Sequence, residues 1–132
     1  MNDLAHCCIL LVEDEYMLAA DLQNELENMG ATVLGPEASV EGALRCVSKE
    51  ARIDAAVLDV NLGGEFVFPV ADALLARQVP FIFSSGYHDG LTRERYPDVV
   101  NCAKPINMRL LVRTMRDLLS SQRRDAVNGS TH

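Results

Sequence analysis

The sequence lacks several features that would place it in a common class at once. It contains no tryptophan, and aromatic residues make up only 5% of its 132 positions. No apolar run approaches the roughly 18 residues that a membrane-spanning helix needs. The first residues, MNDLAHCC, lack the basic segment of a signal peptide. We therefore expect a soluble, cytoplasmic protein that does not associate with membranes.

Basic residues are also scarce: the chain has 12 Lys and Arg but 19 Asp and Glu, which gives a net charge of −7. Phosphate backbones and anionic lipid surfaces repel such a chain, which argues against general nucleic-acid binding. The length suits one domain, and 48% apolar residues can form its core without a disulfide or a structural metal. We expect a single domain over 1–121 with its core in 8–120, a polar, disordered tail over 122–132, and no output domain.

Cysteines and histidines are not arranged for a zinc site. The four cysteines form no C-x-x-C pair, and the three histidines are not spaced to join them around a metal. We interpret the cysteines as small buried side chains that stay reduced. The alternative is a redox role for the adjacent Cys7 and Cys8.

Short β-branched runs alternate with helical patterns along the chain. Strands are predicted over 8–12, 31–34, 53–58, 79–83 and 99–103. Helices are predicted over 18–29, 40–47, 65–77 and 107–120, with at best a short helix in 88–97 and a loop over 61–64. Gly30 suits a helix C-cap, Ser39 an N-cap, and Pro69 a first helical turn. This alternation predicts an α/β fold in which a parallel sheet carries helices on both faces.

Chemically active side chains follow four of the five predicted strands. Glu13 and Asp14 follow the first strand, Asp59 the third, Ser85 the fourth and Lys104 the fifth. Because parallel strands gather their ligands at their carboxyl ends, we expect these side chains at one edge of the sheet. Clustered carboxylates repel one another unless a cation joins them, and an all-oxygen set suits Mg²⁺.

A metal, a lysine and a hydroxyl around one carboxylate favour phosphoryl transfer, and Asp59 is the candidate covalent acceptor. Each part has a plainer interpretation. An acidic pair after a strand is often a solvated turn, a lone Asp is often a cap, and Ser-Ser-Gly is ordinary turn chemistry. The joint occurrence of these parts at the ends of the right strands favours the functional interpretation.

The segments ILLVEDE, AAVLDVNLGG, PFIFSSGY and CAKP, in this order and spacing, carry a family resemblance. Over about residues 8–120 the sequence resembles a response-regulator receiver domain of bacterial two-component signalling. The resemblance implies a flavodoxin-like, doubly wound sheet of five parallel strands in the order 2-1-3-4-5, with five helices. It also implies a cis Lys104–Pro105 peptide bond.

The resemblance further implies that Asp59 accepts a phosphoryl group from a sensor histidine kinase in a Mg²⁺-dependent reaction. It assigns the metal to Glu13, Asp14, Asp59 and the backbone carbonyl of Asn61. It also implies that Ser85 and Lys104 contact the phosphoryl oxygens. The domain would then signal through protein contacts or pass the group to a phosphotransfer protein.

More narrowly, VFPVADAL followed by PFIFSSGY is similar to single-domain alphaproteobacterial receivers with a Phe-Ala-Thr-Gly-x-Tyr motif, whose kinases are often of the HWE/HisKA2 type. Here Ser84-Ser85 replaces Ala-Thr, and Tyr87 directly follows Gly86. We hypothesise that Tyr87 shields the phosphoryl group from water, the alternative being a ring packed under a loop. Asn101 stands where many receivers carry a switch Tyr or Phe, so the usual coupling of hydroxyl to aromatic ring is not expected.

The family's usual output surface consists of the fourth helix, fifth strand and fifth helix, and it is a candidate homodimer face. Here it would present Arg93, Arg95, Arg109, Arg113 and Arg116. Solvated helix faces carry similar charges. Two rival functions remain: a pseudo-receiver that only binds a partner, and a Mg²⁺-dependent phosphohydrolase with an Asp nucleophile. The hydrolase is disfavoured because it needs a second Asp two residues after the nucleophile, where this chain has Asn61.

Overall fold

The computed structural model describes residues 3–86 and 90–129. Its elements in chain order are β1 (Cys8–Val12), α1 (Tyr16–Asn28), β2 (Thr32–Glu37), α2 (Val40–Lys49), β3 (Ala55–Asp59), β4 (Asn61–Leu62), β5 (Glu65–Phe66), α3 (Phe68–Ala76), β6 (Phe81–Ser85), α4 (Gly90–Arg95), β7 (Asn101–Ala103) and α5 (Met108–Gly129). No helix in these described ranges is long and apolar enough to cross a membrane.

Five parallel strands form the central sheet in the order β2-β1-β3-β6-β7. Numbered among the sheet's own strands, this is the predicted order 2-1-3-4-5, and the predicted fold is confirmed. Strand order reverses between β1 and β3, the point at which such sheets bind ligands. The acceptor candidate Asp59 ends β3, the strand at the centre of the sheet.

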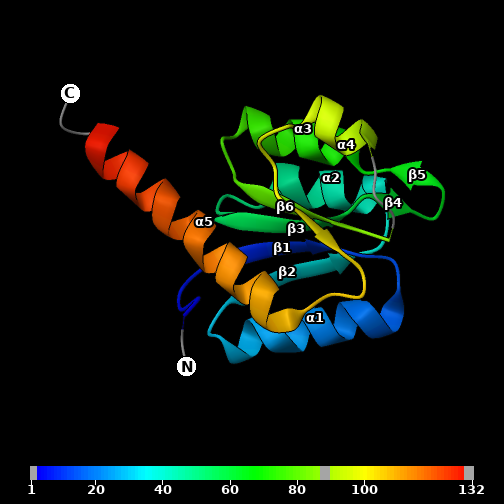
Figure 1. The fold of residues 1–132 in the computed structure, drawn as a ribbon, viewed down its shortest axis with the longest axis horizontal. Coiled ribbons are helices and arrows are strands. Elements are labelled where there is room, and N and C mark those ends of the chain that lie inside the picture. Colours follow the sequence, from blue (N-terminus) through cyan, green and yellow to red (C-terminus); the bar gives the residue numbers. More distant parts are fainter. Residues whose placement is uncertain (1–2, 87–89, 130–132) are drawn as a thin grey trace.

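Helices cover both faces of the sheet (Figure 1): α1 and α5 lie on one face, and α2, α3 and α4 on the other. Strand β1 shows why its run of apolar residues is continuous. Ile9 and Leu11 belong to the core under α1 and α5, whereas Leu10 and Val12 belong to the opposite core. A strand buried on both faces has no solvent-facing position that would favour a polar side chain.

The predicted helix caps are present. Gly30 follows α1 with a φ of 96°, a left-handed conformation that only glycine adopts readily. The Ser39 hydroxyl accepts a 3.0 Å hydrogen bond from the amide of Gly42 at the start of α2. Pro69 lies in the first turn of α3. The Lys104–Pro105 bond is cis, as the resemblance implied.

The third helix begins at Phe68, three residues later than predicted, because the preceding residues form a hairpin. Asn61–Leu62 pairs with Glu65–Phe66 in antiparallel fashion. The two connecting residues, Gly63 and Gly64, have φ values of 57° and 98°. Two successive residues at positive φ make the turn that suits a two-residue hairpin, and Gly-Gly is one of its favoured sequences. The loop predicted over 61–64 is therefore part of an ordered hairpin.

Two further boundaries differ from the prediction. Strand β2 continues through Gly35 and Pro36 to Glu37. It lies at the edge of the sheet, where the missing N–H donor of a proline is tolerated. Helix α5 continues to Gly129, well past the predicted end near 120, so residues 122–129 of the expected tail are helical. Neither proline nor glycine occurs between Met108 and Asn128, so nothing in the sequence stops the helix from propagating.

None of the four cysteines, all of which lie in the described residues, forms a disulfide. Cys7 is buried, and Cys8, Cys46 and Cys102 are half-buried. The prediction of buried thiols is therefore confirmed for Cys7 and only partly met at the other three positions. The redox role of Cys7 and Cys8 stays a hypothesis.

Candidate functional site

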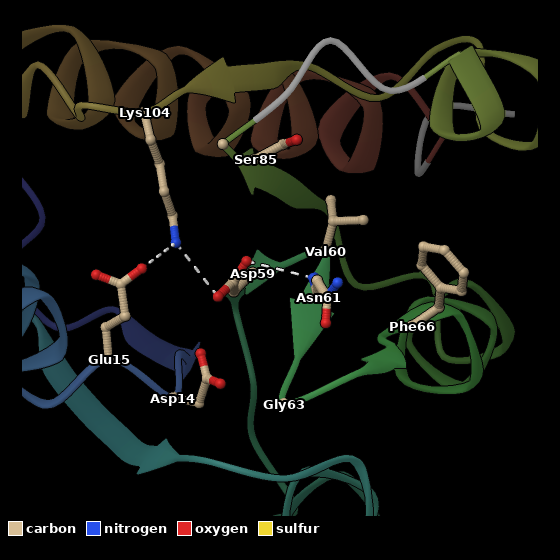
Figure 2. Close-up of a pocket in the computed structure, with 10 residues that line it drawn as sticks. Asp14, Glu15, Asp59, Val60, Asn61, Gly63, Phe66, Ser85 and Lys104 are labelled. Carbon is tan, nitrogen blue, oxygen red and sulfur yellow. Dashed lines mark hydrogen bonds and ion pairs between the residues drawn. The ribbon is translucent and has the colours of Figure 1, made fainter.

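The carboxyl ends of β1, β3, β6 and β7 lie around one pocket (Figure 2). Its volume is about 580 Å³. The lining residues are Asp14, Glu15, Asp59, Val60, Asn61, Gly63, Phe66, Ser85, Gly86 and Lys104. The pocket thus brings together Asp14, Asp59, Ser85 and Lys104 of the residues that the strand ends were expected to contribute, and the fifth, Glu13, is buried beside Asp59 and Lys104 without lining it.

Two of the acids that line the pocket form a cluster with the buried Glu13. One oxygen each of Glu13, Asp14 and Asp59 lie within 4.8 Å of one another. Glu13 is 2% exposed and Asp59 4% exposed, whereas Asp14 is exposed to solvent. Burial, together with the nearby Asp59, raises the pKa of Glu13 to about 7, against the lowering effects of the Glu15 amide and Lys104. Burial also raises the pKa of Asp59, against the hydrogen bonds from Lys104 and the Asn61 amide.

Lys104 is the cation of the site. Its Nζ lies 3.3 Å from Asp59 Oδ2, 3.5 Å from Glu13 Oε1 and 3.2 Å from Glu15 Oε1. Partial burial lowers the pKa of Lys104, but the hydrogen bond to Glu15 and the charges of Asp59 and Glu13 outweigh it and raise the value. The lysine is therefore charged at neutral pH and offsets part of the repulsion among the acids.

The hydroxyl candidate is Ser85, which is buried and lines the pocket from the end of β6. Its backbone carbonyl accepts a 2.8 Å hydrogen bond from the Lys104 amide, which fixes these two residues beside each other. Ser84, the other serine of the motif, is buried but does not line the pocket. Successive side chains of a strand point to opposite faces, so only one of the two serines can serve the site.

Asn61 lies beside the acceptor, and its amide donates a 3.3 Å hydrogen bond to Asp59 Oδ1. Its side-chain oxygen accepts a 2.9 Å bond from the Gly64 amide and so holds the hairpin turn. Metal binding by the backbone carbonyl of Asn61 stays a prediction.

Asn101 lies away from the pocket. Its side-chain amide donates a 3.2 Å hydrogen bond to the Thr92 hydroxyl, which links β7 to α4. Tyr87, the candidate shield, lies outside the described residues. The lining residues that the sequence did not assign to the site include two with large side chains, Glu15 and Phe66. Glu15 carried a signal, because it extends the acidic pair by one carboxylate, whereas Phe66 depends on the hairpin, which was not predicted.

Two arginines of the expected basic face, Arg95 and Arg116, have partners within the chain, and their side chains stay 47% and 46% exposed. Arg95 lies over the ring of Phe68, 4.5 Å from its centroid, and 4.0 Å from Asp72 of α3. Arg116 pairs with Asp3 at 3.6 Å and with Asp117 at 3.8 Å. These two arginines are therefore engaged within the chain, because acidic and aromatic groups of neighbouring segments lie within their reach.

The acidic cluster fits a hard divalent cation. Its donors are all oxygens, as Mg²⁺ prefers. Within the described residues, the buried Glu13 Oε1 has no hydrogen-bond partner, with only the Lys104 ammonium at 3.5 Å. A buried carboxylate oxygen without a donor is an unfavourable arrangement that a bound cation would relieve.

No family model matches the sequence. The phyllosphere-induced regulator PhyR of Methylorubrum extorquens is 31% identical over 127 residues, covering 91% of this chain and 48% of PhyR. The chain thus spans about half the length of this curated relative.

Several solved structures match over nearly their whole length. The solution structure of SdrG from Sphingomonas melonis Fr1 is 42% identical with a TM-score of 0.75, covering 90% of this chain and 99% of SdrG. A BeF3-activated conformation of SdrG from Pseudomonas melonis Fr1 is 40% identical with a TM-score of 0.72, covering 88% and 98%. A response regulator receiver protein from Sinorhizobium medicae is 26% identical with a TM-score of 0.77, covering 89% and 96%. The chain therefore belongs to the response-regulator receiver domains of two-component signalling, which are signalling modules rather than enzymes, and is close to single-domain alphaproteobacterial receivers such as SdrG.

Proposed function

We propose that this domain accepts a phosphoryl group on Asp59 from the phosphohistidine of a sensor kinase. The observation that carries the proposal is the position of Asp59, a nearly buried carboxylate that opens into the pocket between Lys104 and the acids Glu13 and Asp14. That SdrG has a BeF3-activated conformation supports it, because BeF3 mimics a phosphoryl group bound to a carboxylate.

In the proposed reaction, a carboxylate oxygen of Asp59 attacks the phosphorus atom of the donor. The O–P bond forms while the N–P bond of the phosphohistidine breaks, and the electron pair of that bond stays on the imidazole nitrogen. Lys104 lies where it can contact the transferred oxygens, and the Ser85 hydroxyl lies in the same pocket. Both groups would stabilise negative charge on the phosphoryl oxygens.

Glu13, Asp14 and Asp59, with the backbone carbonyl of Asn61, would hold Mg²⁺. When bound, the ion supplies charge neutralisation and orientation for the phosphoryl oxygens. The chain's own residues do the rest. β3 fixes the acceptor, the Asn61 amide holds one of its oxygens at 3.3 Å, and Lys104 approaches the other.

The test is incubation with acetyl phosphate and Mg²⁺, followed by intact-mass spectrometry. The wild-type chain is expected to gain one phosphoryl group that hydroxylamine removes, as it does an acyl phosphate. Asp59→Asn should gain none, and Asp98→Asn, at an exposed position away from the pocket, should behave as wild type. No labelling of the wild type, or equal labelling of Asp59→Asn, contradicts the proposal.

The partner is proposed to be a histidine kinase, of the HWE/HisKA2 type by resemblance, or a phosphotransfer protein. For the output, the α4-β7-α5 side carries exposed apolar side chains: Leu91, Val100 and Leu110 are 38%, 45% and 51% exposed. Apolar side chains of this kind support protein contact, including pairing of two copies. Sedimentation with and without BeF3 tests pairing, and Leu110→Glu should abolish any dimer that forms.

A further inference from the structure

Glu15 occupies the N-cap position of α1, but its side chain caps no helix amide. N-cap positions favour Ser, Thr, Asp and Asn, whose short side chains reach the free amides of the first turn. The Glu15 carboxylate instead accepts a 3.2 Å hydrogen bond from Lys104 Nζ. Figure 2 shows the lysine ammonium between the carboxylates of Glu15 and Asp59. Glu15 therefore contacts the lysine of the site and does not cap the helix.

Lys104 has three N–H donors and faces three carboxylates, Glu13 at 3.5 Å, Glu15 at 3.2 Å and Asp59 at 3.3 Å. Two of these acids are buried, whereas the side chain of Glu15 is 63% exposed. Water screens an exposed ion pair, so the contact with Glu15 is the one that Lys104 gives up most easily.

We propose that Glu15 is a positioning residue that holds Lys104 in the resting site and competes with the phosphoryl oxygens for its ammonium group. The inference rests on the proposed function. When Asp59 is phosphorylated, its carboxylate charge is replaced by the larger negative charge of the phosphoryl oxygens. The Lys104 ammonium then moves toward the phosphoryl oxygens and away from Glu15. The Glu15 carboxylate also repels the negatively charged phosphoryl group. Glu15 thereby lowers the affinity of the site for a phosphoryl group.

The experiment measures BeF3 affinity by ¹⁹F NMR titration, at a Mg²⁺ concentration shown to saturate each variant. Glu15→Gln keeps the length of the side chain and removes its charge. Because exposed ion pairs contribute little, this variant should bind BeF3 about two- to fivefold more tightly than wild type at low salt. Salt of about 0.5 M should bring the two affinities together, since it screens exposed charges. Glu27→Gln, at the far end of α1, makes the same charge change away from Lys104 and should match wild type.

Equal or weaker binding by Glu15→Gln at low salt overturns the inference, as does a gain that persists unchanged at high salt. A purely structural role at the N-cap would not depend on salt in this way. If wild type and Asp59→Asn both fail to bind BeF3, the proposed function itself is contradicted and the inference falls with it. Binding by wild type without a difference in Glu15→Gln leaves the proposed function standing and removes only the role of Glu15.

Discussion

Lys104 Nζ lies 3.3 Å from Asp59 Oδ2, although the two residues are 45 positions apart in the sequence. The sheet creates this contact, because β7 pairs with β6 and β6 pairs with β3, which aligns the carboxyl ends of the strands. The ammonium offsets two buried acids, so the pair has a part in stability as well as in the proposed function.

Replacing Lys104 with Met should therefore destabilise the metal-free domain. The apolar stem is kept, but Glu13 and Asp59 remain buried without their cation. Because either acid can take up a proton, we expect a loss of about 2 kcal/mol, below the range for a fully buried pair. Urea denaturation at neutral pH measures it. Adding Asp59→Asn should recover part of the loss, and strictly additive effects would show that the two residues are not coupled.

The stability of the metal-free domain should fall as pH rises from about 4.5 to 7. Burial raises the pKa of Glu13 from 4.5 to about 7, so the folded state binds more protons than the unfolded state in this window. The contribution is complete below the unfolded value and is lost as pH rises through the folded value. Thermal unfolding without Mg²⁺ should follow this trend. Glu13→Gln should flatten it, whereas Glu94→Gln, an exposed charge on α4, should leave it unchanged.

Arg77 should stabilise the fold far more than an ordinary surface arginine. Its guanidinium donates to the backbone carbonyls of Val47, Glu50 and Ala51 at the end of α2. Helix ends leave such carbonyls without partners, so Arg77→Ala should cost about 2 kcal/mol in chemical denaturation. Arg45→Ala removes an exposed pair with Glu41 and should change stability by less than about 0.5 kcal/mol. Equal effects of the two variants would refute this role.

Tyr96 should fix α4 to α3 through its hydroxyl. The ring is buried against Phe68, Phe81 and Phe83, and the hydroxyl donates a 2.7 Å hydrogen bond to Asp72 Oδ1. Tyr96→Phe keeps the ring contacts and loses the bond to a charged acceptor, so we expect a loss of about 1.5 kcal/mol. Tyr16→Phe is the control, because that side chain is 84% exposed and should have no effect on stability.

The sequence predicts the centre of the sheet well because β1, β3 and β6 are buried on both faces and their sequences are nearly continuous apolar runs. The end of each strand then places Asp59, Lys104 and Ser85 in one pocket without further information. The hairpin after Asp59 was missed because two-residue strands are too short to produce a pattern. The length of α5 was missed because a polar stretch does not distinguish an exposed helix from a tail.

The partners of Arg95, Glu15 and Asn101 could not be predicted either. Each contact joins two different elements of the fold, and the spacing along the chain does not encode which of several nearby groups a polar side chain will reach. Arg95 was expected on a docking face, and nothing in the sequence indicated that its guanidinium would lie over Phe68. The local sequence pattern predicts the strands and helices, whereas these side-chain contacts depend on how the elements pack together.

The sheet order has a consequence for how the site opens. β3 is hydrogen-bonded on both sides, by β1 and β6, whereas β7 is a three-residue strand at the edge. Backbone amides exchange with solvent through local openings, which are easiest at short edge strands. We therefore expect slow amide exchange in β3, which ends at Asp59, and faster exchange in β7, which Lys104 follows. On this expectation, local opening of the site moves the lysine rather than the acceptor carboxylate.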